Sequence, residues 1–519
     1  MKKNIVSKAL CLVFALVLAV CLAPLHNETY GLDGLESKNW IENLTVKELY
    51  PGVTAYQFQS KEDSAYLLNQ WNIVEFDPAQ SDLYVDVTNA DQYSNKLKSV
   101  KQTLEDFNAI NGQGKTAIAG VNGDMWMVSY AHARILGRAD LLATDYKSFA
   151  NDPVVTQSLT IPRGFNVYNG EIISTAHHSS ETPYQGDFTA FGFSADGQVE
   201  LGKPVVTINV VDQTSGASFK PAGINRLPAN NAIMMYTDKG PVSNYALADA
   251  YELIIDFDQD YVIRHGTDIT GTITAITKEG DEDLPMQENR IIITARGKRI
   301  EKLEGFNVGD KVQITISVKD GFGNTEFWQN VQNAVGGHME FARDGKYSGL
   351  SGESGYPTTM LAKTKSGKVL FIVADGRQSG YSVGVPFSTY SKLAKEFDFE
   401  DAFIVDGGGS TTMVQLEAEG YQVVNRPSDK KSDGSYGSPR TVVNTIILSY
   451  GRDRNAPEET ATPEPVATDV PAEPTGVPSG AKTGGGLSAN TIAIIIGVVA
   501  VAAIGVVTAL ILAKNKKKG

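Results

Sequence analysis

Short apolar runs that alternate with polar residues dominate the middle of the chain. Ser81–Val87 alternates polar and apolar residues, and Lys311–Val318 does so strictly after Gly309-Asp310. This period of two is typical of half-buried β-strands. Runs of the same kind occur at Thr116–Val121, Pro204–Val211, Ala232–Tyr236, Tyr251–Phe257, Thr272–Ile276 and Arg290–Ala295. Their density predicts a β-rich accessory region, inserted at about residues 197–320.

Two segments instead show helical spacing. Leu97, Val100, Leu104 and Phe107 predict a helix within Asn95–Phe107. Further on, Val369–Val373 and Ala402–Val405 are buried-type strands that flank an amphipathic helix over Phe387–Phe397. A strand, helix and strand at this spacing predict a parallel crossover unit. We therefore expect a mixed α/β (α+β) fold whose mixed sheet carries this unit.

Both ends of the chain carry targeting signals. A basic start and the apolar run Ala9–Ala23 predict a signal peptide at residues 1–23. A transmembrane anchor fits less well there, because only about 15 residues are continuously apolar and a span needs about 20. Ile492–Ala513 holds 22 uncharged, almost wholly apolar residues, and a basic tail follows at 514–519. These features predict a membrane helix with a cytoplasmic tail and an outward-facing body.

The segment before this helix predicts a stalk. Residues 455–486 are rich in Pro, Thr, Ala and Glu and hold no aromatic residue, so they cannot bury a core. The expected plan is a signal peptide (1–23), an N-terminal segment (32–105), a main domain (106–450), the stalk, the membrane helix and the tail. This plan predicts a single-pass protein of a bacterial cell membrane, with an extracellular body.

Charge and cysteine content exclude some classes of function. The net charge is −14, and seven of the 46 basic residues lie in the two terminal segments, so the remainder sets 39 basic against 60 acidic residues. Such an acidic body argues against nucleic acid as a partner. Cys11 and Cys21 both lie in the predicted signal peptide, which leaves the mature chain without a thiolate site or a disulfide.

Five short motifs follow one another along the chain. They are Asn122-Gly-Asp124, Ala374-Asp-Gly-Arg-Gln378, Asp406-Gly-Gly-Gly-Ser-Thr-Thr412, Val423-Val-Asn-Arg-Pro-Ser-Asp429 and Arg440-Thr-Val-Val-Asn444. In this order, from about Lys115 to Tyr450, the chain resembles the phosphodiester glycosidase family. That family includes the animal enzyme that uncovers mannose 6-phosphate, together with bacterial exopolysaccharide-related proteins. The resemblance implies hydrolysis of a sugar 1-phosphodiester to a free sugar and a phosphomonoester.

Two carboxyl groups are the candidate catalytic residues. Glycosidic cleavage requires one carboxyl group at the anomeric carbon and another that handles protons. Asp375 and Asp406 each end a predicted strand, and neighbouring parallel strands would bring them to one sheet edge. Asp residues in these places also serve as simple turn formers. Whether the reaction retains or inverts configuration depends on the separation of the two groups, about 5–5.5 Å or 6.5–9.5 Å, which stays open.

Several other residues are candidate substrate-binding groups. Arg377 and Arg440 suit the departing phosphate as bidentate donors, although Arg440 also suits a salt bridge to either aspartate. The glycines let backbone N–H groups approach an anion, and the asparagine amides suit sugar hydroxyls unless they are turn residues. The full candidate set is Asn122, Asp124, Arg377, Gly407, Gly408, Gly409, Ser410, Thr411, Asn425, Arg440 and Asn444.

Two positions depart from the family pattern. Thr358 stands where the family carries an arginine, and Asp124 stands where it commonly has a small residue. A lost cation and an added carboxylate would both weaken phosphate binding. The alternatives are therefore an enzyme with a different diester substrate, and a non-catalytic glycan-binding surface protein that keeps the fold. A purely structural wall protein ranks last.

Metal and cofactor chemistry has little support in the sequence. His177-His178 has no third ligand at useful spacing, and His338 is a candidate acid–base group. We expect no cofactor, while a divalent cation such as calcium stays open. The expected partners are a glycan or sugar-phosphodiester substrate and, through the C-terminal helix, a membrane.

Overall fold

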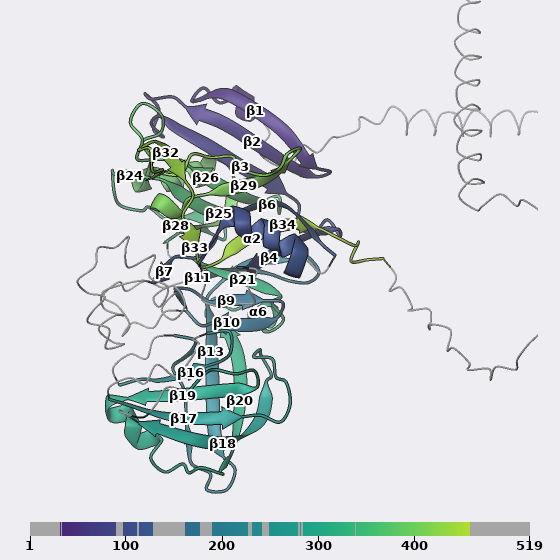
Figure 1. Ribbon diagram of the computed structural model, residues 1–519. Coiled ribbons are helices and arrows are strands. Elements are labelled where there is room, and N and C mark those ends of the chain that lie inside the picture. Colours follow the sequence, from purple (N-terminus) through teal and green to yellow (C-terminus); the bar gives the residue numbers. More distant parts are fainter. Residues whose placement is uncertain are drawn as a thin grey trace, which may run out of the picture. The chain divides into compact units, whose positions relative to one another are not determined.

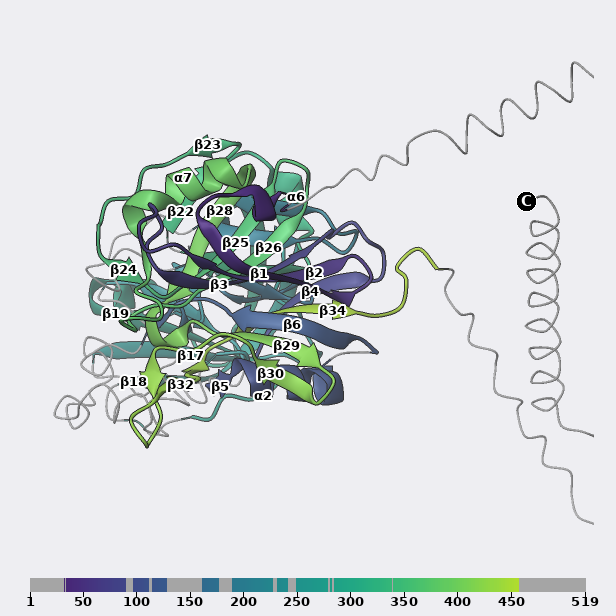
Figure 2. The same ribbon diagram turned by 90° about the horizontal axis from the view of Figure 1, so that it is seen from above.

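Two β-sheets pack face to face and form a sandwich (Figures 1 and 2). The computed structural model describes residues 32, 34–89, 97–111, 114–127, 161–176, 189–226, 231–240, 249–278, 281, 284–337 and 339–456. The first sheet has the order β1 (Ile41–Tyr50), β2 (Val53–Ser60), β3 (Asn69–Phe76), β26 (Val369–Ala374), β25 (Thr358–Thr364), β28 (Phe399–Gly407), β22 (Met339–Arg343) and β23 (Lys346–Tyr347). The second has the order β30 (Gly420–Val423), β29 (Met413–Glu417), β6 (Thr116–Asn122), β34 (Thr445–Tyr450) and β4 (Leu83–Thr88).

One short helix covers the outer face of each sheet. Helix α7 (Tyr390–Glu396) buries Tyr390, Leu393 and Ala394 against the first sheet. Helix α2 (Val100–Asp106) packs Val100 and Leu104 on the second. A capping box, in which Ser99 and Gln102 exchange side-chain and backbone hydrogen bonds, fixes the start of α2. The layers are therefore helix, sheet, sheet and helix.

Two further sheets lie beyond this sandwich. A five-stranded sheet has the order β10 (Glu171–Ser174), β9 (Asn166–Tyr168), β21 (Asn333–Gly337), β11 (Thr189–Phe193) and β12 (Val199–Gly202). An eight-stranded sheet has the order β14 (Ser218–Phe219), β13 (Pro204–Asp212), β20 (Lys311–Asp320), β18 (Asp268–Lys278), β17 (Ala250–Asp256), β19 (Arg290–Arg296), β16 (Ile233–Tyr236) and β15 (Gly223–Ile224). The five-stranded sheet contributes Phe191 and Val335 to the core of the sandwich and Ala190 and Ala334 to the core of the eight-stranded sheet, so it connects the two.

Short elements complete the described part of the chain. Two-stranded pairs are β24 (Gly355–Tyr356) with β27 (Val385–Pro386), β31 (Asp429–Lys430) with β32 (Tyr436–Ser438), β33 (Thr441–Val442) with β5 (Lys98–Ser99), and β7 (Trp126–Met127) with β8 (Ile161–Pro162). The remaining helical elements are η1 (Leu35–Ser37), η2 (Phe107–Asn111), η4 (Gly297–Lys302), α6 (Thr325–Gln329), η5 (Phe387–Thr389) and η6 (Gly408–Ser410).

The predicted α/β class is wrong, because the fold is mainly β and its large sheets pair almost entirely antiparallel. The strand–helix–strand order is present as β26, α7 and β28, but these two strands are not neighbours. Strand β25, which the sequence patterns did not single out, lies between them and pairs antiparallel with both. An antiparallel hairpin of β25 and β26 needs only a tight turn, so no crossover is required to bring these two strands together.

The predicted signal peptide, membrane helix and basic tail, and nearly all of the stalk, lie outside the described residues, as do His177, His178 and His338. Within the described ranges, no helix is long and apolar enough to cross a membrane.

The contact between β21 and β28 depends on a glycine. A Cβ atom at Gly337 would overlap the ring of Phe403, which is buried in the core of the sandwich. We expect Gly337→Ala to lower the free energy of unfolding by about 1–3 kcal/mol, because the core cannot accept the added volume without moving. Urea unfolding measures this change. Gly305→Ala is the matched control, since nothing lies within 4 Å of a Cβ there, and an equal effect of the two substitutions would contradict the explanation.

Candidate active site

The two predicted catalytic aspartates lie at the same edge of the first sheet. Asp375 directly follows β26, and Asp406 is the penultimate residue of β28. Both strands are antiparallel to β25, so they run in the same direction, and Thr358 and Thr359 of β25 separate their ends. Two strand spacings of about 4.8 Å place the backbones of the two aspartates roughly 10 Å apart.

A β-bulge sets the direction of the Asp406 side chain. Met360 pairs with Ile404, but the next residue, Thr359, pairs with Asp406, so Val405 is an extra residue in β28. Without it, Asp406 would point to the opposite face from Val405, which is in the core between the sheets. The bulge turns Asp406 to the same face as Thr359, toward the end of β6.

Asp406 is a buried carboxyl surrounded by donors and cations. Asp406 is only 8% exposed, and its Oδ1 accepts a hydrogen bond from the Gly407 N–H at 2.6 Å. Burial raises its pKa from 3.8 to about 6, opposed by the hydrogen bonds from Gly407 and Ser410 and by the charges of Arg440 and Arg163. With a pKa of about 6, this carboxyl is mostly ionised at neutral pH.

Both oxygens of the Asp375 carboxylate already accept hydrogen bonds from other residues of the protein. Its Oδ1 accepts from Asn425 Nδ2 at 2.8 Å, and its Oδ2 accepts from the Arg426 N–H at 2.9 Å and from the Tyr381 hydroxyl at 3.2 Å. Burial raises its pKa to about 6 although these bonds lower it. This arrangement makes Asp375 an anchor for the loop that follows β30, and its predicted catalytic role stays a prediction.

The three predicted asparagines tie segments together. Asn122 Oδ1 accepts from the Thr359 hydroxyl at 2.6 Å and from the Thr412 N–H at 3.0 Å, which links β6 to the first sheet. Asn425 also accepts the Met413 N–H at 2.8 Å. Asn444 Oδ1 accepts the Asp124 N–H at 2.9 Å. These amides therefore shape the site, and direct contact with sugar hydroxyls stays a prediction.

The triple-glycine loop brings two arginines close to the backbone. Gly408 has φ of +68°, and a Cβ there would lie 3.1 Å from Arg377 Nη1. A Cβ at Gly409 would collide with the guanidinium of Arg440, whose Nε and Nη2 bind Asp429 at 2.9 and 3.1 Å. The glycines thus permit two cations to lie directly against the loop. Arg440 pairs with Asp429, not with Asp375 or Asp406 as the sequence had left open.

Arg377 remains available to a ligand. Its side chain is exposed and lies 5.5 Å from the centre of the Tyr356 ring. Within the described part of the chain it forms no salt bridge. Arg377 itself has φ of +59°, a strained value for a non-glycine residue that points its side chain across the loop.

Asp124 is a third buried carboxyl, close enough to Asp406 for the two charges to interact. It follows β6, is 1% exposed, and its Oδ2 accepts from the Gly164 N–H at 2.5 Å and Asn166 Nδ2 at 3.1 Å. Burial raises its pKa to about 6, the Gly164 and Asn166 bonds and the Arg226 charge lower it, and the charge of Asp406 raises it. Asp124 and Asp406 therefore interact electrostatically.

Sequence reasoning missed three arginines. Arg163 acts on Asp406, Arg226 acts on Asp124, and Arg426 stacks 3.5 Å from the centre of the Tyr381 ring. Arg426 lies within a quoted motif and could have been selected for its charge. Arg163 and Arg226 lie in no motif, and only the fold brings them to the carboxyls.

Thr358, the position of the family arginine, is buried. Its hydroxyl donates to the Tyr356 carbonyl at 3.1 Å and accepts from the Tyr390 hydroxyl at 2.8 Å. A threonine here therefore faces α7, on the opposite face of β25 from Thr359 and Asn122.

A metal site requires several ligating side chains that converge. No group of three or more His, Cys, Asp or Glu side chains converges among the described residues. Nothing in the donor set at Asp406 calls for a cation, because arginines already surround it.

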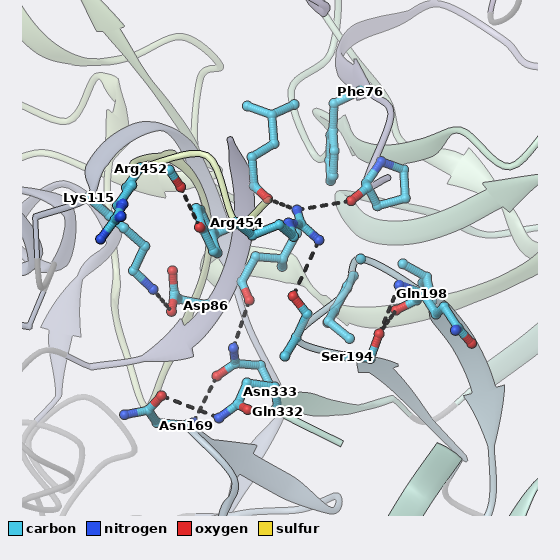
Figure 3. Close-up of a pocket in the computed structure, with 18 residues that line it drawn as sticks. Phe76, Asp86, Lys115, Asn169, Ser194, Gln198, Gln332, Asn333, Arg452 and Arg454 are labelled. Atoms are coloured by element: carbon cyan, nitrogen blue, oxygen red, sulfur yellow. Dashed lines mark hydrogen bonds and ion pairs between the residues drawn. The ribbon is translucent and has the colours of Figure 1, made fainter. Parts of the chain in front are cut away.

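A separate cavity of about 340 Å³ lies at the other end of β6 (Figure 3). Lys115 binds Asp86 at 2.6 Å on its wall, and Arg454 donates to several backbone carbonyls there. Lys115 precedes β6 while Asn122 ends it, so about seven strand residues, roughly 20 Å, separate the cavity from the aspartates. The cavity contains none of the predicted site residues.

Comparison with known proteins agrees with the four motifs between Ala374 and Asn444. Residues 266–449 match the family described as phosphodiester glycosidase. The chain therefore carries a phosphodiester glycosidase family domain, and the predicted family is confirmed. A comparison with curated proteins found no match.

Solved structures support the fold. A hypothetical protein from Synechocystis has a TM-score of 0.54 at 14% identity, and the match covers 79% of this chain but only 64% of that one. A Burkholderia pseudomallei protein has a TM-score of 0.57 at 14% identity, with 79% and 97% covered. The catalytic domain of zebrafish N-acetylglucosamine-1-phosphodiester alpha-N-acetylglucosaminidase has a TM-score of 0.35 at 12% identity, with 79% of this chain and 84% of that chain covered.

The buried Asp375 predicts a pH dependence of stability. Its folded pKa of about 6 exceeds its ordinary 3.8, so its contribution to stability is complete below about pH 4 and is lost as the pH rises through about 6. We expect Asp375→Asn to remove this loss, so that its stability relative to the native protein increases by about 3 kcal/mol between pH 4 and pH 7. Urea unfolding at several pH values measures the difference. A difference that does not change with pH would contradict the burial of this carboxyl.

Proposed function

We propose that this protein hydrolyses a sugar 1-phosphodiester in a cell-wall or exopolysaccharide glycan. The products are a free sugar and a phosphomonoester. The observation that carries the proposal is a buried carboxyl, Asp406, beside a glycine loop on which two arginines lie. A negative group for the sugar and positive groups for the phosphate are thereby next to each other, as cleavage of the bond between them requires.

Asp406 acts on the sugar. Departure of the phosphate leaves positive charge on the anomeric carbon, and an ionised carboxylate stabilises that charge. Its hydrogen bonds from Gly407 and Ser410 hold it in one orientation. Because its pKa is about 6, we expect it to be ionised at neutral pH.

The arginines act on the phosphate. Arg377 is exposed beside Gly408 and offers a planar pair of donors that match two phosphate oxygens. Arg440 is oriented by its two bonds to Asp429, so it presents its remaining charge without losing side-chain entropy on binding. A phosphomonoester has a second pKa near 6, so it leaves without a strong general acid.

The test is turnover of a panel of sugar 1-phosphodiesters, including the methyl ester of α-N-acetylglucosamine 1-phosphate. We expect release of reducing sugar, and we expect Asp406→Asn to reduce it at least about a hundredfold, since one electrostatic group contributes on that scale. Asp401→Asn is the matched control. Asp401 lies in the same strand, is also buried with a pKa of about 6, and binds the Asp344 N–H away from the site.

Each outcome decides between the proposals. Equal loss in both variants would mean that damage to β28, and not the chemistry of Asp406, explains the effect. Binding of the diesters with no turnover in the native protein would contradict hydrolysis and support a glycan-binding surface protein.

We also propose that the protein is displayed on the outer face of a bacterial cell membrane. The support is the order of a signal-like start, a Pro-rich segment and an apolar segment followed by lysines. Protease added to intact cells should remove the body and leave a C-terminal tag intact. Cleavage of the body only after lysis would contradict this orientation.

A further inference from the structure

Asp124 is held more firmly than a turn residue needs to be. Its N–H donates to Asn444 Oδ1 at 2.9 Å, and the Gly123 N–H before it donates to the Asn444 carbonyl at 2.9 Å. Its side chain packs where Gly164 and Gly336 approach each other, and a Cβ on either glycine would lie 2.9 Å from Asp124 Oδ2. The two glycines therefore let the backbone fit closely around Oδ2 of this carboxyl.

The two oxygens of this carboxyl differ. Oδ2 accepts from Gly164 and Asn166, whereas Oδ1 is buried and has no hydrogen-bond partner among the described residues. A buried charged oxygen without a donor is unfavourable, because it has lost its hydration and gained no hydrogen bond in return. Such an atom calls for a water molecule or a ligand hydroxyl.

The residue pair Arg163-Gly164 connects Asp124 with Asp406. The Gly164 N–H binds Asp124, and the Arg163 charge acts on Asp406. A second connection runs through β21, where Gly336 contacts Asp124 and Gly337 packs against Phe403, three residues before Asp406. Residues 163–164 and strand β21 thus both link the surroundings of Asp124 to β28.

Unsatisfied hydroxyls accompany the unpartnered oxygen. Thr411 and Thr412 are fully buried, and their Oγ1 atoms find no hydrogen-bond partner within the described part of the chain. The Thr412 N–H binds Asn122 Oδ1, two residues before Asp124. Polar atoms that lack partners in one region are typical of a place where water is held.

We propose that Asp124 is the second catalytic carboxyl, the base that receives a proton from the attacking water while Asp406 stabilises the anomeric carbon. This inference rests on the proposed hydrolysis of a sugar 1-phosphodiester. In this proposal the attacking water lies between Asp124 Oδ1 and the anomeric carbon.

The proposed step is balanced. The bond between the water oxygen and the anomeric carbon forms as the bond from that carbon to the phosphate oxygen breaks. The phosphomonoester leaves with the electron pair of the broken bond, and Asp124 takes one proton from the water. Asp124 then loses that proton to solvent, which restores the ionised base.

Burial and four charged groups determine when Asp124 is ionised. Burial raises its pKa, Arg226 lowers it and Asp406 raises it, while Arg440 and Arg163 act on Asp406. Asp124 and Asp406 each have a pKa of about 6. Both must be ionised for the proposed step, so the logarithm of kcat/KM should fall with a slope of two at low pH.

The experiment uses the full-length protein and its Asp124→Asn variant. We expect kcat/KM to fall by about 10²–10⁴-fold, the range for loss of a general base, and the low-pH slope to change from two to one. The Asp401→Asn control should keep both the rate and the slope. A variant that folds, as judged by its urea unfolding curve, and keeps a rate within threefold of the native protein would overturn the proposal.

A titration tests the pair without turnover and without the Asp124→Asn variant. Carboxyl-carbon NMR on aspartate-labelled protein should show that Asp406→Asn lowers the pKa of Asp124, because a neighbouring negative charge is removed. No change in that pKa would overturn the pairing. Absence of turnover in the native protein with the pKa shift present would instead contradict the proposed hydrolysis and leave the pair established.

Discussion

The pairing of β25 with two strands at once is the interaction on which the site depends. β25 is antiparallel to β26 and to β28, so these two strands point the same way and end at one edge. Thr359 of β25 also donates to Asn122, which attaches the second sheet at that edge. Two sheets and three strand ends are therefore brought together by one buried strand.

The bulge at Val405 gives this edge its chemistry. A regular strand would place Asp406 toward the face covered by α7, where the residues are apolar. One extra residue turns the carboxyl toward Asp124, Arg163 and the glycine loop. Burial raises the pKa of Asp406 and of Asp124 to about 6, while hydrogen bonds and, to a smaller extent, the arginine charges lower it.

The accessory strands are part of the site's electrostatics. Arg226 follows β15 of the eight-stranded sheet and is fully buried, with its guanidinium charge acting on Asp124. Gly164 lies just before β9, and Gly336 lies in β21 of the five-stranded sheet. Both glycines contact the Asp124 carboxyl. Arg226, which lies in the region that the sequence patterns predict to be an accessory, thus contributes directly to the charge balance at Asp124.

The sequence by itself determined the family, the individual strands such as Thr116–Asn122 and Lys311–Asp320, and the short motifs that meet at the site. These are local properties, because side-chain alternation and turn residues act over a few positions. Tertiary structure decided the fold class. The sequence before Asp375 has no distinctive pattern that indicates β25, the strand that lies between β26 and β28. Tertiary structure also decided that the Asp375 carboxylate accepts hydrogen bonds from Asn425, Arg426 and Tyr381. Asp124, in contrast, keeps an oxygen that has no hydrogen-bond partner among the described residues. Partner choice between residues far apart in the chain depends on packing, and spacing along the sequence does not encode it.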